Sequence, residues 1–259
     1  MRRPVGLQPD DVAEVMATFG VAEAQVRRDH AISHILAALS RRHSEELIFF
    51  GGTALSRTYL LDERLSEDID LIAVDQRDDL AGTLLKDIDA ALARTHGRIT
   101  WSPGWSRNSD VDPAVALTPD GIAIKIQLLR GAGYEPWPTE TREIEQRYRD
   151  APPAILRVPT LQAFAGWKTA AWMDRGAARD LYDLWALDKV GALTAESAAL
   201  FATHGPTSSP PRSWMFKGAP SAAESQAQLA GQTRLTVTAA EALEAVRSAW
   251  AAAVGEEWS

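Results

Sequence analysis

The chain has 259 residues, a formal net charge of -8 and no cysteine. This length allows one large domain or two modest ones, and the missing cysteines exclude disulfides, thiolate metal sites and cysteine nucleophiles. The acidic balance argues against polyanion binding by the whole surface, although it is compatible with a local basic groove. No apolar run reaches the length of a membrane-spanning helix, and the N-terminus lacks the apolar block of a secretory signal. We therefore expect a cytoplasmic protein without membrane contact.

The first 130 residues alternate between helical and strand patterns. Apolar residues at helical spacing predict helices over residues 8–19, 21–42 and 79–94. Short apolar or alternating runs predict strands in "EELIFFGG" (45–52) and "SEDIDLIAV" (66–74), and again over residues 98–107, 114–119 and 121–130. Between the first two strands, "TALSRTYLL" predicts one or two helical turns packed behind the paired glycines.

The second half of the chain is predominantly helical. Glycines and prolines over residues 131–144 predict a link between two lobes. Beyond it, Thr160 is the expected N-cap of a long helix, Gly176 is its expected end, and an alanine-rich helix is expected over residues 239–254. We expect an α+β protein of two lobes, with a mixed sheet and flanking helices in residues 1–150 and a helical lobe in residues 151–259.

The central chemical feature is a pair of aspartates in a strand. Asp68 and Asp70 are two residues apart, so a strand would project both carboxylates from one face while Ile69 and Leu71 enter the core. A shared cation resolves the repulsion between the carboxylates. Because Mg²⁺ prefers hard oxygen ligands from one or two carboxylates together with substrate phosphates, the pair predicts part of a magnesium and phosphate site.

The residues before this strand favour the same chemistry. Gly51 and Gly52 form a predicted tight turn whose amides could approach a triphosphate, and Thr53 could add a hydroxyl. Arg64 could reach phosphate oxygens or stabilise the strand entrance by pairing with an acid. A lone double glycine is usually only a turn, and a lone D-x-D is often an exposed strand edge, so the order of the elements carries the prediction.

The stretch "FFGGTALSRTYLLDERLSEDIDL", residues 49–71, resembles the signature of the AbiEii/AbiGii nucleotidyltransferase-like toxins, within the DNA polymerase beta-type superfamily. The preceding "VRRDHAISHILAAL" and the later "GWKTAAWMDRGAARDLYDLWAL" extend the resemblance. It implies a toxin of a two-gene toxin–antitoxin system that transfers nucleotides from an NTP to an RNA acceptor. The acceptor that the resemblance implies is the 3′ end of tRNA, whose modification blocks translation. The resemblance also implies a cognate antitoxin, expected to be a winged-helix regulator.

The resemblance assigns roles to matched residues of the first lobe. Gly51, Gly52 and Thr53 match the glycine turn that holds the triphosphate, and Asp68 and Asp70 match the metal-binding aspartates. Arg64 and Ser66 match positions of the family's "R-F-S-E-D-I-D" phrase, in which Leu65 here replaces an aromatic residue.

A third carboxylate, common in the superfamily, is missing from the expected strand. Gln127 occupies the position in "IAIKIQLL" where it would lie, and a neutral amide ligates more weakly than a carboxylate. Lys125 would face the same side and could meet a phosphate instead. This departure leaves two-metal chemistry less supported than nucleotide binding.

A second group of charged residues lies in the helical half. Lys168 and Arg175 fall on nearly one helix face, while Asp180 and Asp183 follow on the next helix. Local ion pairing, such as that of Arg179 with Asp183 at helical spacing, would account for these charged residues with no functional role. By resemblance, however, Lys168 matches a lysine that contacts NTP phosphates, and Asp183, or else Asp180, matches an acid that orients that lysine or deprotonates the acceptor. This assignment implies a substrate cleft between the lobes.

Two other functions remain open from the sequence. A small-molecule nucleotidyltransferase of the antibiotic-modifying kind would share the glycine turn and the D-x-D. A catalytically silent nucleotide-binding or protein-binding module would fit the neutral Gln127. His30 and His34 stand four apart without the glutamate of a zinc-protease motif between them, and we interpret them as structural residues.

Overall fold

The computed structural model describes residues 6–105, 110–131 and 137–258, and in this part of the chain a seven-stranded sheet organises the first half. The strands are β1 (Leu47–Phe50), β2 (Asp68–Ala73), β3 (Thr100–Trp101), β4 (Ala114–Leu117), β5 (Ala123–Arg130), β6 (Thr139–Ile144) and β7 (Ala154–Pro159). Their spatial order is β3-β4-β5-β2-β1-β7-β6. β2 runs parallel to β5 and antiparallel to β1, so the sheet is mixed, as the sequence predicts.

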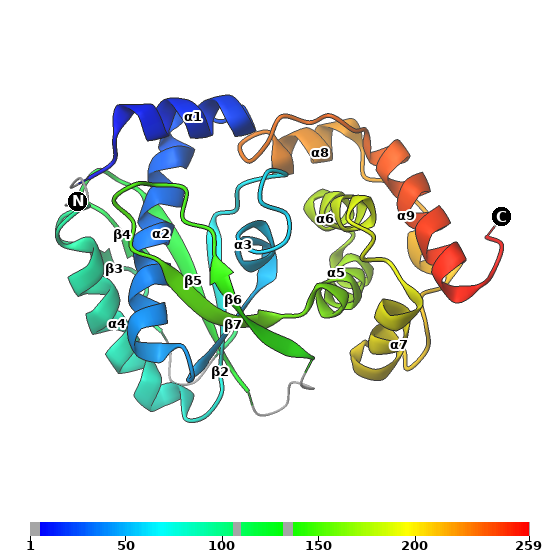
Figure 1. The fold of residues 1–259 in the computed structure, drawn as a ribbon, viewed down its shortest axis with the longest axis horizontal. Coiled ribbons are helices and arrows are strands. Elements are labelled where there is room, and N and C mark those ends of the chain that lie inside the picture. Colours follow the sequence, from blue (N-terminus) through cyan, green and yellow to red (C-terminus); the bar gives the residue numbers. More distant parts are fainter. Residues whose placement is uncertain (1–5, 106–109, 132–136, 259) are drawn as a thin grey trace. The chain divides into compact units, whose positions relative to one another are not determined.

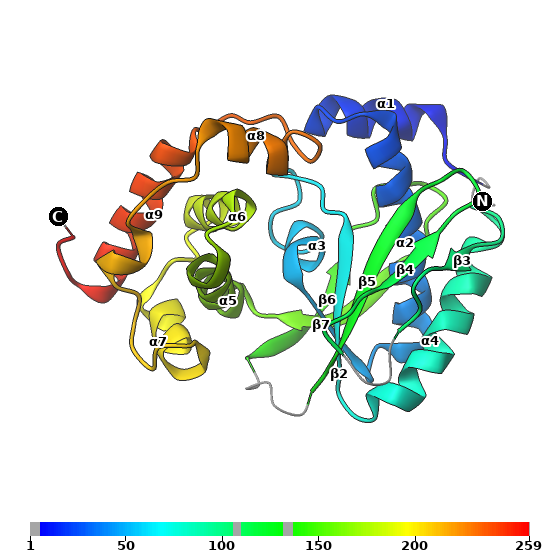
Figure 2. The ribbon, with the colours of Figure 1, turned by 180° about the vertical axis from the view of Figure 1, so that it is seen from behind.

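Among its described residues, the sheet unit has the helices α1 (Pro9–Phe19), α2 (Glu23–His43), α3 (Gly51–Ser56) and α4 (Arg77–Leu92). α2 lies in front of β4 and β5 in Figure 1 and behind them in Figure 2, so it covers one face of the sheet. Its apolar stripe is fully buried, with Ile32, Ile35 and Leu36 at 0% exposure. α4 packs beside α2 and buries Leu84 and Ile88. Burial of these stripes is the main source of stability for such helices.

The second half of the chain forms helices: α5 (Leu161–Arg175), α6 (Ala178–Lys189), α7 (Ala195–His204), α8 (Ala222–Leu229) and α9 (Ala239–Val254), with a 3₁₀ turn at Ser213–Phe216. The Thr160 hydroxyl accepts a hydrogen bond from the Ala163 amide, and Gly176 ends α5 with φ +58°. Both predicted helix boundaries are confirmed. α9 buries Val246 and Trp250 completely, so it is a core helix of this unit.

Two compact units divide the chain. The first comprises Met1–Tyr134 with Glu140–Val158, and the second Glu135–Thr139 with Pro159–Ser259. The predicted α+β class, with strands first and helices later, is confirmed. The predicted ranges 1–150 and 151–259 differ from these units because β7 pairs with β1 and therefore belongs to the sheet.

Three sequence predictions need correction. The predicted link over residues 131–144 contains strand β6, whereas residues 132–136 lie outside the described part. The strand predicted over residues 98–107 is reduced to β3, because Pro103 has no amide to continue the pairing, and residues 106–109 also lie outside. β7 was not predicted as a strand; its alternating burial, with Leu156 and Val158 inside, is the signal that could have identified it.

Candidate active site

Asp68 and Asp70 begin strand β2 and share one face of it. Both are half-buried, whereas Ile69 and Leu71 between and after them have 0% exposure. The strand period therefore places the carboxylates on the face opposite to the apolar side chains. In the described part of the chain no hydrogen bond or ion pair engages the Asp68 carboxylate, which leaves its oxygens open to a ligand.

The glycine turn lies directly against these carboxylates. β1 ends at Phe50, which stands opposite Asp70 in the antiparallel pair, and the chain turns at Gly51 with φ +77°. A Cβ at Gly51 would stand 2.0 Å from Asp70 Oδ2. Only glycine fits here, because both the left-handed backbone and the approach to the carboxylate exclude a side chain.

The remaining residues of the motif hold the turn and the strand together. The Thr53 hydroxyl donates a hydrogen bond to the Asp68 carbonyl, so it fixes the start of β2 and is not available to donate to a phosphate. A Cβ at Gly52 would meet Arg64 Nη2 at 2.7 Å and Ser66 Oγ at 3.1 Å. Arg64 is buried and donates to the Leu65 carbonyl, so in this structure it stabilises the strand entrance.

Gln127 occupies the position that the sequence assigns to a third acid. In the parallel β2–β5 pair, Asp68 is in register with Lys125 and Asp70 with Gln127. The Gln127 amide nitrogen donates to the Val111 carbonyl at 2.9 Å, which holds the side chain in place. The face therefore offers two carboxylates, one amide and one ammonium group.

These residues fit a divalent cation. Two carboxylates on one strand face supply hard oxygen ligands, and one of them has no protein partner in the described residues. Because residue 51 is glycine, the Asp70 carboxylate occupies the space that a side chain at residue 51 would otherwise fill. A cation bound here can activate an attacking hydroxyl or neutralise a leaving pyrophosphate.

The second predicted group forms a buried ion cluster within the helical unit. Lys168 Nζ lies 2.6 Å from Asp183 Oδ2 and 3.2 Å from Asp180 Oδ1. Arg175 binds Asp180 through two nitrogens, at 2.6 and 2.9 Å. All but Arg175 are at most 6% exposed. The structure thus joins Lys168, Asp180 and Asp183, and it contains no Arg179–Asp183 ion pair among the described residues.

The charges of this cluster set the ionisation of Asp180. Burial alone raises the pKa of this carboxyl, but the Lys168 ammonium and the Arg175 guanidinium outweigh burial and lower the pKa below its usual value. Asp180 therefore stays ionised and holds both cations. Asp183, by contrast, contacts Lys168 at the shorter distance and orients its ammonium group.

A mixed sheet with a glycine turn beside two strand carboxylates is the arrangement that the sequence predicts for a nucleotidyltransferase. The family described as "Nucleotidyl transferase AbiEii toxin, Type IV TA system" matches residues 34–256, and the chain belongs to this family. The sequence-based family assignment is thereby confirmed. No curated protein matches the chain.

Several solved structures match the fold, and two of them show the following similarity to this chain. MenT4, a nucleotidyltransferase toxin from Mycobacterium tuberculosis, is 23% identical with a TM-score of 0.73, over 97% of this chain and 91% of that one. A protein from H. pylori described as a candidate nucleotidyltransferase is 15% identical with a TM-score of 0.56, over 89% and 94%.

Membership of the family establishes a nucleotidyltransferase toxin of a type IV toxin–antitoxin system. Such an enzyme uses an NTP and a divalent metal, and it has an antitoxin partner. In the described residues no helix is both long and apolar enough to cross a membrane.

Sequence reasoning missed a buried polar network that supports the glycine turn. Arg57 follows α3 and donates to the Asp29 carboxylate at 2.8 Å and to the Glu145 carbonyl at 2.7 Å. The Tyr148 hydroxyl donates to the other Asp29 oxygen at 2.9 Å. Burial and the neighbouring Asp29 carboxylate both raise the pKa of Tyr148, which keeps this donor protonated. The partners stand 28, 88 and 119 residues apart, too far for a local sequence pattern to indicate these contacts.

Proposed function

We propose that the chain transfers a nucleotidyl group from an NTP to an RNA acceptor, the 3′ end of tRNA, and thereby blocks translation. The single observation that carries the proposal is the contact of the Gly51 turn with Asp70, beside Asp68. This arrangement brings backbone amides and two carboxylates together, which is what binding of a metal-complexed triphosphate requires.

Asp68 and Asp70 would hold Mg²⁺, and the amides of Gly51 and Gly52 would contact phosphate oxygens. When bound, the ion would supply charge neutralisation at the phosphates. In the described residues the half-buried Asp68 carboxylate has no protein partner, so it is the group most available to bind the ion. Thr53 and Arg64 would act as positioning residues, because their side chains donate to the Asp68 and Leu65 carbonyls. Ser66 would act with them, since its Oγ lies close to Gly52.

In the helical unit, Lys168 would contact the NTP phosphates. Its ammonium has three donors, of which Asp180 and Asp183 take two, so one remains for a phosphate oxygen. The short Asp183 contact supports an orienting role for this acid, and Arg175 and Asp180 would maintain the cluster. The antitoxin partner would be a winged-helix regulator.

The test is incubation of the protein with each labelled NTP, Mg²⁺ and total tRNA. We expect label in tRNA with the wild type, and a loss of at least 100-fold in Asp68→Asn, because a neutral amide replaces a metal-binding carboxylate. Glu67→Gln is the matched control: this neighbouring acid pairs with Arg28 at the surface, and its change should leave transfer within twofold.

The register of Gln127 with Asp70 favours one alternative, a nucleotide-binding module without turnover. Tight NTP binding with no label transferred to any RNA would support that alternative. Label transferred only to small hydroxyl compounds, with Lys168→Ala unaffected, would instead indicate a small-molecule nucleotidyltransferase.

A further inference from the structure

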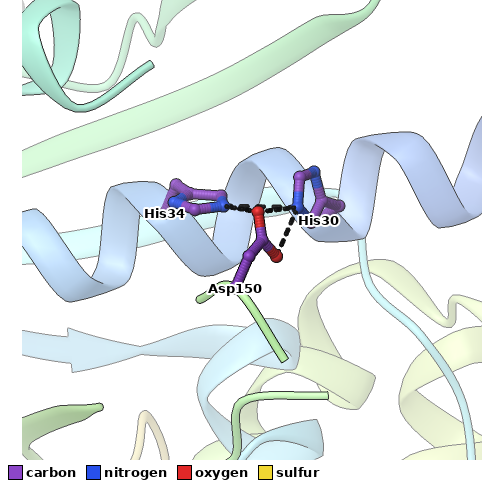
Figure 3. A group of neighbouring side chains, drawn as sticks. All are labelled: His30, His34 and Asp150. Carbon is purple, nitrogen blue, oxygen red and sulfur yellow. Dashed lines mark hydrogen bonds and ion pairs between the residues drawn. The ribbon is translucent and has the colours of Figure 1, made fainter. Parts of the chain in front are cut away.

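Three buried side chains converge between α2 and the segment that follows β6. His30 and His34 lie one turn apart on α2, and Asp150 faces both of them from the other segment (Figure 3). The exposed fractions are 2% for His30, 8% for His34 and 7% for Asp150. This group is separate from the Asp68–Asp70 pair in both residues and ligand chemistry.

The three facing atoms form a nearly regular triangle. His30 Nε2 lies 3.2 Å from His34 Nε2 and 3.1 Å from Asp150 Oδ2, and His34 Nε2 lies 3.2 Å from the same oxygen. Ligands of a tetrahedral Zn²⁺, at bond lengths of about 2.0–2.1 Å, stand roughly 3.3 Å apart. The side lengths of the triangle therefore match three corners of a zinc coordination tetrahedron.

Hydrogen bonds alone cannot satisfy all three contacts of this triangle. Each neutral imidazole carries at most one proton on Nε2, and the triangle has three contacts for at most two such protons. If both protons point to Asp150, the two nitrogens meet at 3.2 Å with no proton between them. A single cation resolves this conflict, because both Nε2 lone pairs and the carboxylate can point at it.

Contacts of the other His30 ring nitrogen are compatible with the tautomer that a metal ligand needs. His30 Nδ1 lies 3.1 Å from His96 Nε2, and His96 Nδ1 lies 2.8 Å from the Thr95 hydroxyl. With Nε2 as a metal ligand, His30 Nδ1–H donates to His96 and His96 Nδ1–H donates to Thr95. Such a second layer is what holds metal-ligating histidines in place. Burial lowers the pKa of His30 and His34, and that of His96 to about 4, so the rings are neutral.

We propose that His30, His34 and Asp150 bind a Zn²⁺ ion that fastens α2 to the segment after β6. Two imidazole nitrogens and one carboxylate favour zinc over Mg²⁺, which prefers oxygen ligands. The second Asp150 oxygen, 3.0 Å from His30 Nε2, or a water completes the coordination. A hollow of about 270 Å³ lined by His30, His96 and Asp120 reaches His30, one of the three proposed ligands.

The test is calorimetric titration of EDTA-treated full-length protein with Zn²⁺ in excess Mg²⁺, which occupies any oxygen-only site. We expect one Zn²⁺ per chain for the wild type. His34→Gln and Asp150→Asn should weaken the Kd more than tenfold, and His96→Gln by about tenfold through the second layer. The control is His43→Gln, another buried histidine of α2, which pairs with Asp87 at 2.8 Å and should bind Zn²⁺ as the wild type does.

A variant that fails to fold would also lose zinc binding, so a second measurement is made on the wild type. Co²⁺ in this site should show the intense visible absorption of tetrahedral coordination, which Zn²⁺ should abolish at one equivalent. Absence of this absorption, or zinc binding by the wild type no tighter than by His34→Gln, would overturn the proposal. Loss of binding in His43→Gln equal to that in His34→Gln would also contradict it.

Discussion

Gly51 is the residue whose geometry is most restrictive in the candidate active site. Its φ of +77° lies in the left-handed region, and a Cβ would stand 2.0 Å from Asp70 Oδ2. Gly82, in the exposed interior of α4, has neither restriction, since a Cβ there meets no atom within 4 Å. The two glycines form a matched pair for substitution.

We expect Gly51→Ala to destabilise the protein by about 1–3 kcal/mol through backbone strain, and to displace the Asp70 carboxylate. Gly82→Ala should instead stabilise by about 0.5–1 kcal/mol, because alanine is the better helix residue. Urea unfolding and the tRNA labelling assay measure both effects. Equal stability of Gly51→Ala and the wild type would show that the turn does not require glycine.

At the same scale, the sequence predicts the local arrangement of the candidate site residues but not all of their contacts. The period of two in β2 was enough to place Asp68 and Asp70 on one face and Ile69 in the core. The engagement of the Thr53 hydroxyl with the Asp68 carbonyl, and of His34 with Asp150, could not be predicted. These contacts depend on how distant segments pack, which local periodicity does not encode.

At the scale of elements, helices α5 and α6 are joined by the buried Lys168 cluster. Removing one partner of a buried ion pair leaves uncompensated charge, so Lys168→Met should destabilise the protein by about 3–5 kcal/mol at pH 7. Lys189→Met is the control. That exposed lysine lies over the Trp185 ring, and its loss should cost less than about 1 kcal/mol.

The cost of Lys168→Met should depend on pH. The pKa of Asp180 is lower in the folded protein than in the unfolded chain, so its stabilisation is present above about pH 4 and is lost as the pH falls through the folded value. Denaturant midpoints measured from pH 7 to pH 3 should therefore show a shrinking difference between wild type and variant. A difference that is constant over this range would contradict the cluster's electrostatic role.

Elements with a strong local pattern were predicted from the sequence, and those defined by pairing were not. α2, β2 and the Thr160 cap carry periodicity or capping chemistry in their own residues. β6 follows a turn-rich stretch, and β7 is a six-residue strand ending in Pro159. β7 becomes a strand because the edge of β1 supplies hydrogen-bond partners, and β6 does so because β7 supplies them. Both causes are tertiary.

At the scale of the whole molecule, the position of β7 decides where the sheet unit ends. β7 lies between β1 and β6 in the sheet, and Leu156 and Val158 are fully buried. The sequence places the domain boundary at residue 150, before this strand. In the structure the sheet unit extends instead to Val158, although residues 135–139 belong to the helical unit.

Two fragments distinguish these boundaries. We expect residues 1–159 to unfold cooperatively, since they retain all strands described for the sheet and its core. Residues 1–150 should not, because without β7 the edge of β1 loses its partner, the core loses Leu156 and Val158, and β6 has no neighbour. Thermal melts followed by far-ultraviolet circular dichroism, with amide proton dispersion as a second probe, measure the difference. If residues 1–150 melted as sharply as residues 1–159, β7 would be dispensable and the earlier boundary would be the right one.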